Sequence, residues 1–414
     1  MHKLILTGTV LFFTTITSVE AQMSFDRSTL QKIDSVRKAL AQWQSPESRV
    51  NAWIYLASSY IDLSQTDSAQ YCLEKGFRII SQSPYRSGEY FLLSYQAELL
   101  DKNTLYDEAL RFALKGKKIA DSTGDHELIG NNYMLMGLIY NDSGQPLKAI
   151  PYLRQSLNFL PVNSHQNHSI ARRQHSFLNL GQCYLKVKQY HVANYWLKKA
   201  IQESNAQHDY RVMAISHWLI GKSYDYIGNH TLAGSQYRIG VLHAKLIHDW
   251  DATILFTPQL FYYYYRRNQT KKALSTLYSG LQLVKEKHER IAMLPLKDFY
   301  VDLVAIYQLL NDYPKAINAQ QKVLDMTEQI NRKANSQRLF LIQTFNHQET
   351  QLLKLNVEHK NQEILLRKNQ SLTIILSISL ALAAAIFGII YYWLQQRRRY
   401  ESIQQEQKVA DLEQ

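Results

Sequence analysis

The chain has 414 residues, of which 46% are hydrophobic and 20% are charged, with only 15 Gly and 8 Pro. This composition is typical of an ordered, helix-rich protein and excludes a chain made mainly of flexible linkers. The formal net charge of +12 favours anionic partners, a class that includes nucleic acids.

The first element in the chain is a short apolar segment. Lys3 precedes a mainly apolar stretch over 4–16, and Val19 and Ala21 follow at the spacing of a cleavage site. This pattern is typical of a secretory signal, and about thirteen residues are too few to span a bilayer core of about 30 Å. No Cys follows the stretch, which excludes a lipoprotein anchor. We therefore predict a signal peptide over 1–21; a buried amphipathic starter helix is the alternative.

We expect residues 22–47 to form an N-terminal capping helix. Residues 48–325 then repeat one register of helical positions. A small residue is followed by a large one three positions later and by an Ala twelve positions later, as in Gly181, Tyr184 and Ala193. Such spacings place the residues on one helix face, and the small ones let neighbouring helices approach closely. The recurring Ala positions are Ala69, Ala109, Ala149, Ala193, Ala233, Ala273 and Ala316.

This register resembles the tetratricopeptide repeat (TPR) family. Successive Ala positions are 40 to 44 residues apart, longer than the usual 34 residues, so each helix pair is expected to carry about one extra turn. Turn-forming residues such as 141–144 and 311–314 lie between the paired helices. The predicted fold is all-α, a TPR helical-hairpin solenoid of about seven repeats of about 40 residues, and such stacks commonly bind a partner.

The two cysteines, Cys72 and Cys183, fall in the first and fourth repeats. Helices three units apart in a solenoid cannot meet, so we expect two buried thiols and no disulfide bond.

Two further elements follow the repeats. Residues 326–370 are polar and favour helix, without Gly or Pro, and we predict a stalk or coiled-coil helix that could pair two copies as a homodimer. The seam is imperfect, because Lys360 and Arg367 interrupt the spacing of its apolar residues. Residues 371–394 then carry no charge, and their Leu, Ile and Phe side chains favour insertion into a bilayer. We predict one transmembrane helix there.

The signal and the single span predict the topology. One span after an export signal places the repeats outside the cytoplasm and leaves residues 395–414 as a short cytoplasmic tail. Arg397, Arg398 and Arg399 follow the span, in keeping with that orientation. We therefore expect a single-pass protein of the bacterial inner membrane with its repeats in the periplasm.

The topology also locates the net charge. Signal and tail each sum to zero, so all twelve excess positive charges belong to the exported part. An exported domain does not meet nucleic acid, and no nucleic-acid partner is expected. An acidic peptide, an anionic glycan or the membrane surface is a better candidate; a solvated surface without a charged ligand is the alternative.

The order of these elements resembles the exported sensor part of bacterial TPR histidine kinases and TPR helix-turn-helix regulators. That resemblance implies an output domain after the span. The last His is His359, before the span, and twenty residues cannot hold a helix-turn-helix domain. We expect either a shortened relative of such sensors or one that passes its signal to a separate partner.

Two candidate motifs, a phosphate-binding loop and a histidine cluster, are incomplete. Residues 221–223 read Gly-Lys-Ser like the end of a phosphate-binding loop, but Ser216 stands where that motif requires Gly. His165, His168 and His175 cluster without the spacing of metal ligands. We expect no enzyme activity, no cofactor and no metal site.

The TPR resemblance also implies a binding face. In the family, the first helix of each pair lines the concave groove, at fixed positions around the small residue. Carried onto this chain, those positions are Asn179, Gln182, Lys186, Trp218, Lys222, Asp225, Tyr226, Tyr262, Tyr265 and Arg266. Such a mixture of amides, aromatic rings and charges suits an extended peptide; the alternative is that the aromatic rings serve internal packing.

We therefore predict a membrane-anchored TPR protein that binds a protein or peptide outside the cytoplasm and relays a signal across the membrane. The alternative is a static envelope scaffold with no signalling role.

Overall fold

The computed structural model describes residues 25–40, 42, 44–160 and 173–412, and the predicted signal peptide lies outside them. It divides into two units, 1–341 and 342–414, which we describe separately. Every regular element in the described ranges is a helix. The elements are α2 (Phe25–Leu40), α3 (Pro46–Asp62), α4 (Thr66–Gln82), α5 (Arg86–Lys102), α6 (Tyr106–Thr123), α7 (His126–Asp142), α8 (Pro146–Phe159), α9 (Arg173–Lys186), α10 (Tyr190–Gln207), α11 (Tyr210–Tyr226), α12 (His230–Leu246), α13 (Trp250–Arg266), α14 (Thr270–Lys287), η2 (His288–Arg290), α15 (Met293–Leu309) and α16 (Tyr313–Leu412).

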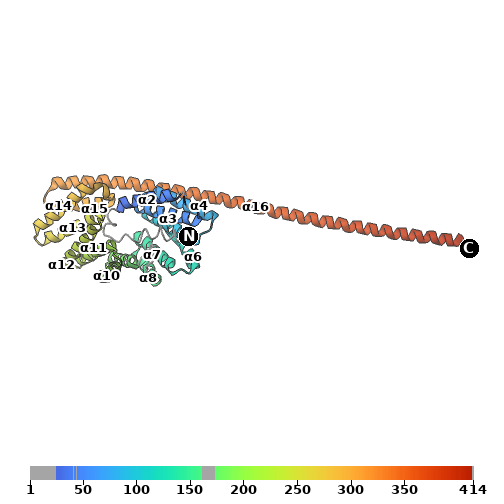
Figure 1. Ribbon diagram of the computed structural model, residues 1–414, viewed down its shortest axis with the longest axis horizontal. Coiled ribbons are helices and arrows are strands. Elements are labelled where there is room, and N and C mark those ends of the chain that lie inside the picture. The colour runs from blue at the N-terminus through green and yellow to red at the C-terminus, as the bar shows by residue number, and fades with distance from the viewer. Residues whose placement is uncertain (1–24, 41, 43, 161–172, 413–414) are drawn as a thin grey trace. The chain divides into compact units, whose positions relative to one another are not determined.

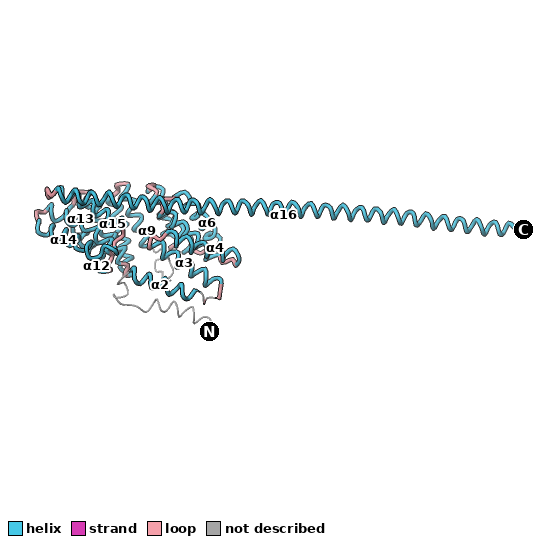
Figure 2. Tube along the Cα trace, turned by 90° about the horizontal axis from the view of Figure 1, so that it is seen from above, coloured by secondary structure: helices cyan, strands magenta, loops and turns pink. Residues whose placement is uncertain are grey.

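The first unit is a stack of helical hairpins (Figure 1). Helices α3 and α4 form the first hairpin, and each following pair repeats it up to α13 and α14. Short loops join the helices (Figure 2). In the seventh pair, α15 is followed by the start of α16, which supplies the second helix. The predicted all-α solenoid of helical hairpins is therefore confirmed.

The recurring Ala positions are the places where the paired helices meet. All seven are buried, and none is more than 5% exposed. The small residue of the first helix faces the same contact: a Cβ added to Gly181 would lie 2.5 Å from Leu197 Cγ, and one added to Gly137 would lie 2.6 Å from Leu153 Cγ. The register is thus a packing register, since a larger side chain would push the helices apart.

The turn inside each hairpin also repeats. Its central residue has a positive φ in all seven turns of the described chain, and only two of the seven are Gly. The seven are Ser64, Thr104, Gly144, Lys188, Gly228, Asn268 and Asn311. The next residue donates its backbone N–H to the carbonyl at the large-residue position, as from Gln145 to Tyr140 (2.8 Å) and from Gln189 to Tyr184 (2.8 Å). This bond closes the end of the first helix in the manner of a Schellman cap.

Buried polar groups are bonded across neighbouring helices. The Tyr90 hydroxyl donates to the Leu128 carbonyl (2.9 Å), and Asn132 Nδ2 donates to the Ala113 carbonyl (2.9 Å). Both cysteines are buried, as predicted, and burial raises the pKa of each thiol to about 12. These thiols are therefore packing groups rather than nucleophiles.

Helix α16 continues from the last hairpin without a break for 100 residues. Inside the first unit, Gln337 Nε2 lies 3.5 Å from the Ser64 carbonyl in the first hairpin turn, and Leu341 is fully buried. This helix therefore reaches the hairpin at the opposite end of the array.

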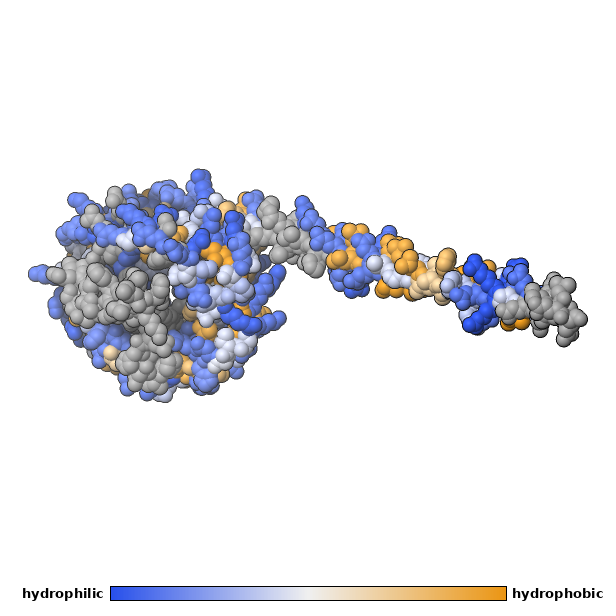
Figure 3. Space-filling view, turned by 45° about the vertical axis from the view of Figure 1, so that its right-hand side comes forward, coloured by the Kyte–Doolittle hydropathy of each residue, from blue (hydrophilic) through white to orange (hydrophobic). Residues whose placement is uncertain are grey.

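The second unit is the remainder of α16. Apolar side chains form a band along it (Figure 3). The stretch Lys360–Gln405 is long and apolar enough to cross a membrane, with a window of mean hydropathy 2.5 and none of that window buried. The predicted apolar helix is therefore present.

Candidate ligand-binding face

The first helices of the pairs form a continuous row. Each contacts the first helix of the next pair, from α3 to α5 and onward through α7, α9, α11 and α13 to α15. Side chains at equivalent positions on this row therefore become neighbours, although they are about 40 residues apart in sequence. We call this surface the first-helix row.

Two of the predicted residues neutralise each other near the α11–α12 turn. The Asp225 carboxylate accepts a hydrogen bond from the Tyr237 hydroxyl (2.7 Å), lies 2.8 Å from His230 Nδ1 and forms an ion pair with Arg266 (3.5 Å). Tyr226 is exposed beside them and stacks on Tyr190. Asp225 is therefore committed to contacts inside the chain, which links the fifth and sixth repeats.

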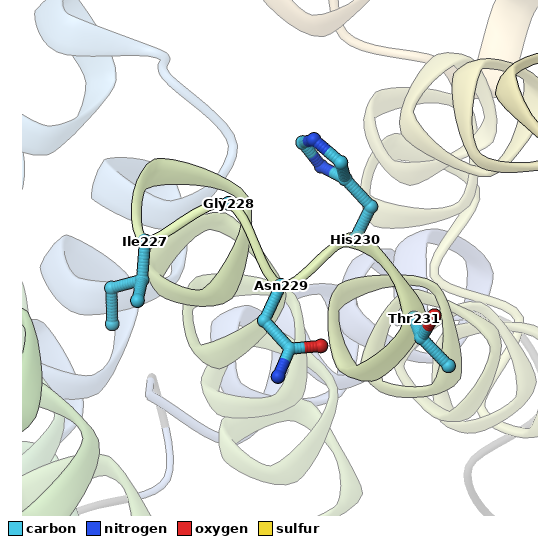
Figure 4. Close-up of a pocket in the computed structure, with 5 residues that line it drawn as sticks. All are labelled: Ile227, Gly228, Asn229, His230 and Thr231. Carbon is cyan, nitrogen blue, oxygen red and sulfur yellow. The ribbon is translucent and has the colours of Figure 1, made fainter.

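A hollow of about 450 Å³ lies next to this group, lined by residues 227–231 (Figure 4). It is formed by the hairpin turn itself. The His230 ring projects from the opposite side of the turn to Ile227 and Asn229. The hollow therefore does not gather functional side chains from different repeats.

Lys222 and Tyr262 occupy equivalent positions on α11 and α13, the next two helices of the row. The Lys222 ammonium lies 4.6 Å from the centre of the Trp218 ring, and that ring stacks on Phe256 at 5.2 Å. Burial lowers the pKa of Lys222, opposed by the negative charge of Asp302 on α15. Burial and the same Asp302 charge raise the pKa of Tyr262 to about 12. The charge of Asp302 thus acts on one side chain from each of the two preceding first helices.

Asp302 was absent from the residues predicted from sequence. Burial is the main cause that raises the pKa of its carboxyl to about 6. The negative charge of Asp298 adds to this rise, and the positive charge of Lys222 opposes it. It stands two positions before Val304, which occupies the small-residue place of the seventh repeat. Extending the family positions to that repeat would have found it.

A second group occupies the row between the second and fourth repeats. Asp101 is buried at 5% exposure, and its Oδ1 has no donor among the described residues. Its carboxyl lies against that of Asp142, and burial with the Asp142 charge raises the Asp101 pKa to about 7. Burial raises the pKa of Asp142 as well, against the opposing charge of Lys186. Burial therefore favours the protonated form of both carboxyls.

The other predicted residues take different positions. Lys186 reaches back to α7 and donates to the Asn141 carbonyl (2.8 Å), and the Cys183 thiol donates to Asn141 Oδ1 (3.4 Å). Asn179 is buried and Gln182 is half-buried. Tyr265 stacks on Phe261 at 5.6 Å, which is a packing contact. The ten predicted residues thus form several local groups rather than one site.

No metal site is found among the described residues: they contain no group of three or more His, Cys, Asp or Glu side chains placed to hold an ion. Two members of the histidine cluster noted in the sequence, His165 and His168, lie outside the described ranges.

Comparison with known proteins gives one family match within the repeats. Residues 131–159, the third hairpin, match the tetratricopeptide repeat family. No curated protein sequence matches the chain.

Several solved structures are similar. A signal-transduction ATPase (STAND) protein with a TPR sensor from Pyrococcus horikoshii aligns with 68% of this chain at 18% identity (TM-score 0.49), but the aligned part is only 44% of that protein. A Rap protein complexed with Competence and Sporulation Factor aligns over 75% of this chain and all of its own, at 11% identity (TM-score 0.46). The pilus biogenesis factor PilW aligns over 56% of this chain and 94% of its own, at 15% identity (TM-score 0.41). These likenesses concern the helical-repeat fold.

Proposed function

We propose that the chain is a membrane-anchored repeat protein that binds a protein or peptide along its first-helix row and relays that event across the membrane. The observation that carries the binding role is the group formed by Trp218, Lys222 and Tyr262. It offers aromatic faces, a donor cation and a hydroxyl from adjacent repeats, the combination that holds an extended peptide.

Membrane anchoring is supported by the exposed apolar segment in the second unit. Leu380 and Phe387 are 76% and 75% exposed within an uncharged stretch of 24 residues of α16. Such a surface is unfavourable in water and suits a bilayer core of about 30 Å. The proposed topology has the repeats in the periplasm of a bacterium, the span at 371–394 and the tail at 395–414 in the cytoplasm.

Relay is supported by the continuity of α16. One helix serves as the second helix of the last hairpin, as the proposed stalk over 326–370 and as the proposed span. A displacement of the last hairpin therefore reaches the membrane without passing through a loop.

Peptide binding can be tested with the full chain in detergent. The protein is immobilised and incubated with a mixture of random decapeptides, and retained peptides are quantified by mass spectrometry. Replacing Tyr262, Tyr265 and Arg266 together with Ala should reduce retention. Replacing Tyr278 with Ala is the matched control, because it removes an exposed ring from a second helix. Equal retention by both variants would exclude this face as the binding surface.

Topology can be tested with single exposed cysteines. Because both native thiols are buried, the parent chain should not react with a membrane-impermeant maleimide and serves as the unlabelled control. In intact cells, Lys198→Cys in α10 should be labelled and Gln404→Cys in the tail should not. The reverse labelling would refute the proposed orientation.

Relay and static scaffolding differ in their need for an unbroken helix. A chimera with a histidine-kinase domain fused after Gln414 should change its autophosphorylation when the peptide mixture is added. Gln362→Pro should abolish that change because Pro interrupts the helix, whereas Gln362→Ala should preserve it. A chimera that binds peptides without any change in kinase activity would favour the scaffold.

A further inference from the structure

The fifth hairpin, formed by α11 and α12, contains two histidines whose rings stack on each other. The ring centres of His217 on α11 and His243 on α12 are 5.7 Å apart, and the ring planes differ by 16°. The ring of Tyr210, at the start of α11, stacks on His243 as well, at 5.8 Å. His243 is therefore held against α11 by two ring contacts.

The hydrogen bonding of this pair suits uncharged rings. His217 Nδ1 lies 2.7 Å from the side-chain oxygen of Gln236, so it donates there and the neutral ring carries its proton on Nδ1. His243 Nδ1 is buried and has no hydrogen-bond partner among the described residues. Charging His243 would place a hydrogen on that nitrogen, which would become a buried donor without an acceptor.

The same ring contact occurs in the third hairpin without a pair of histidines. Tyr133 and Phe159 stand at the positions of His217 and His243, and their rings stack at 5.7 Å with an angle of 20°. His126 meets the edge of the Phe159 ring there. The contact is thus a repeated packing feature, and the fifth hairpin builds it from two groups that can both become cations.

The acidic groups on the helices around this pair are engaged elsewhere. Neither ring forms an ion pair with a carboxylate of the described chain within 4 Å. The neighbouring acids and their partners are Glu203 with Arg173, Asp209 with His175, Asp249 with Arg211, Asp225 with His230 and Arg266, and Asp251 with the Ala292 N–H. The neighbouring bases are the exposed Lys198, Arg238 and Lys245, the half-buried Lys199, Lys222 over the Trp218 ring, His208 against Tyr210 and His248 against Trp250.

The direction of the pH response follows from burial. Burial lowers the pKa of both histidines from the ordinary value of 6.5; at His217 the Gln236 bond opposes this and the charge of His243 adds to it. The folded hairpin therefore resists protons that the unfolded chain binds below about pH 6.5. Its stability should fall as the pH falls below that value. This is opposite to the response of Asp101, whose pKa is raised.

We propose that His217 and His243 form an acid-sensitive switch that opens the fifth hairpin when both rings become charged. Two cations then replace two neutral stacked rings, and their repulsion separates α12 from α11. Because α11 belongs to the first-helix row, opening changes the row beside Trp218. The opening itself does not depend on what the row binds.

The test is hydrogen exchange of the full chain in detergent, measured by mass spectrometry at pH 8 and pH 5 and corrected for the pH dependence of chemical exchange. Two like charges 5.7 Å apart, in an effective dielectric constant of about 20, shift an equilibrium by about a hundredfold, and solvent around half-buried rings reduces this. Protection of α11 and α12 should therefore fall at least about tenfold at pH 5, whereas that of α7 and α8 should not fall. Equal protection of α11 and α12 at both pH values, or an equal fall in α7 and α8, would overturn the inference.

Variants assign the effect to the two rings. His243→Phe should abolish the fall at pH 5, because Phe159 shows that Phe stacks at this position. His217→Phe should do the same, since Phe177 occupies the equivalent position in the fourth hairpin. His288→Phe, which removes an exposed histidine outside this hairpin, should leave the fall unchanged. A fall that persists in either stack variant would refute the assignment, and the parent comparison of the two hairpins decides the question if a variant does not fold.

Discussion

Asp101→Asn should stabilise the protein at alkaline pH and change little at acidic pH. The Asp101 carboxyl is buried against that of Asp142, and its Oδ1 lacks a donor among the described residues. Titratable neighbours surround the pair: Glu98, whose own pKa is raised by burial, and Lys102 on α5, and Lys186 on α9. The nearby hydroxyl of Tyr106 on α6 is neutral at these pH values. Asn keeps the shape of the side chain and supplies a neutral donor toward Asp142, so the variant isolates the cost of the buried charge.

The magnitude follows from the shift in pKa. Burial and Asp142 raise the Asp101 pKa from 3.8 to about 7. Each unit corresponds to 1.36 kcal/mol, so the upper limit is about 4 kcal/mol. Because the folded state holds the proton more tightly than the unfolded state, the free energy of unfolding falls as pH rises between about 4 and 7. Above pH 7 the full penalty is present, and below pH 4 it is absent.

The assay is urea unfolding of the full chain in detergent, followed by helical circular dichroism at pH 5 and pH 8. The parent should lose stability between these values, and Asp101→Asn should flatten that dependence by raising the midpoint at pH 8. Asp121→Asn is the control, because its exposed pair with Lys117 contributes about 1 kcal/mol at most. A midpoint for Asp101→Asn below that of the parent at pH 8 would show that the carboxylate has a stabilising partner, and the reasoning would fail.

Three further outcomes are expected. Gly181→Leu should destabilise the array by about 1–3 kcal/mol through overpacking against Leu197, measured as a lower urea midpoint; an unchanged midpoint would refute the register at that hairpin. Tyr90→Phe should cost about 1–3 kcal/mol in the same assay, because the Leu128 carbonyl loses its buried donor, and no cost would mean that water replaces the hydroxyl. Leu380→Lys should reduce recovery in carbonate-washed membranes, since a charge at the centre of a span costs about 2.5–3.5 kcal/mol, and unchanged recovery would count against the span.

The sequence register predicted the hairpins and their contacts because packing between paired helices depends on local spacing. Ala193 and Gly181 are twelve residues apart, close enough for periodicity to reveal that they share one interface. The positive-φ turns escaped prediction at Lys188 and similar positions, because only Gly and Asn signal that conformation reliably. In these hairpins the helix ends hold Ser, Thr and Lys residues in the positive-φ conformation as well.

The candidate site was less predictable. Family positions identified Lys222 and Tyr262 but could not show that Asp225 is neutralised by Arg266, since pairing depends on which rotamers reach across to the next repeat. The pair of buried carboxyls was not predicted, for a related reason. Asp101 and Asp142 are 41 residues apart, and burial of two acids against each other has no local sequence signal.

The contact between Gln337 and Ser64 changes how the array should lose its structure. In a linear solenoid each terminal repeat has a neighbour on one side only and frays independently. Here the helix that leaves the last hairpin also lies against the first, so the two ends share one element. Melting of the first hairpin would remove the Ser64 carbonyl that Gln337 contacts and loosen that helix near the end of the first unit. The ends of the array should therefore unfold together, and the fold behaves more like a closed loop than an open stack.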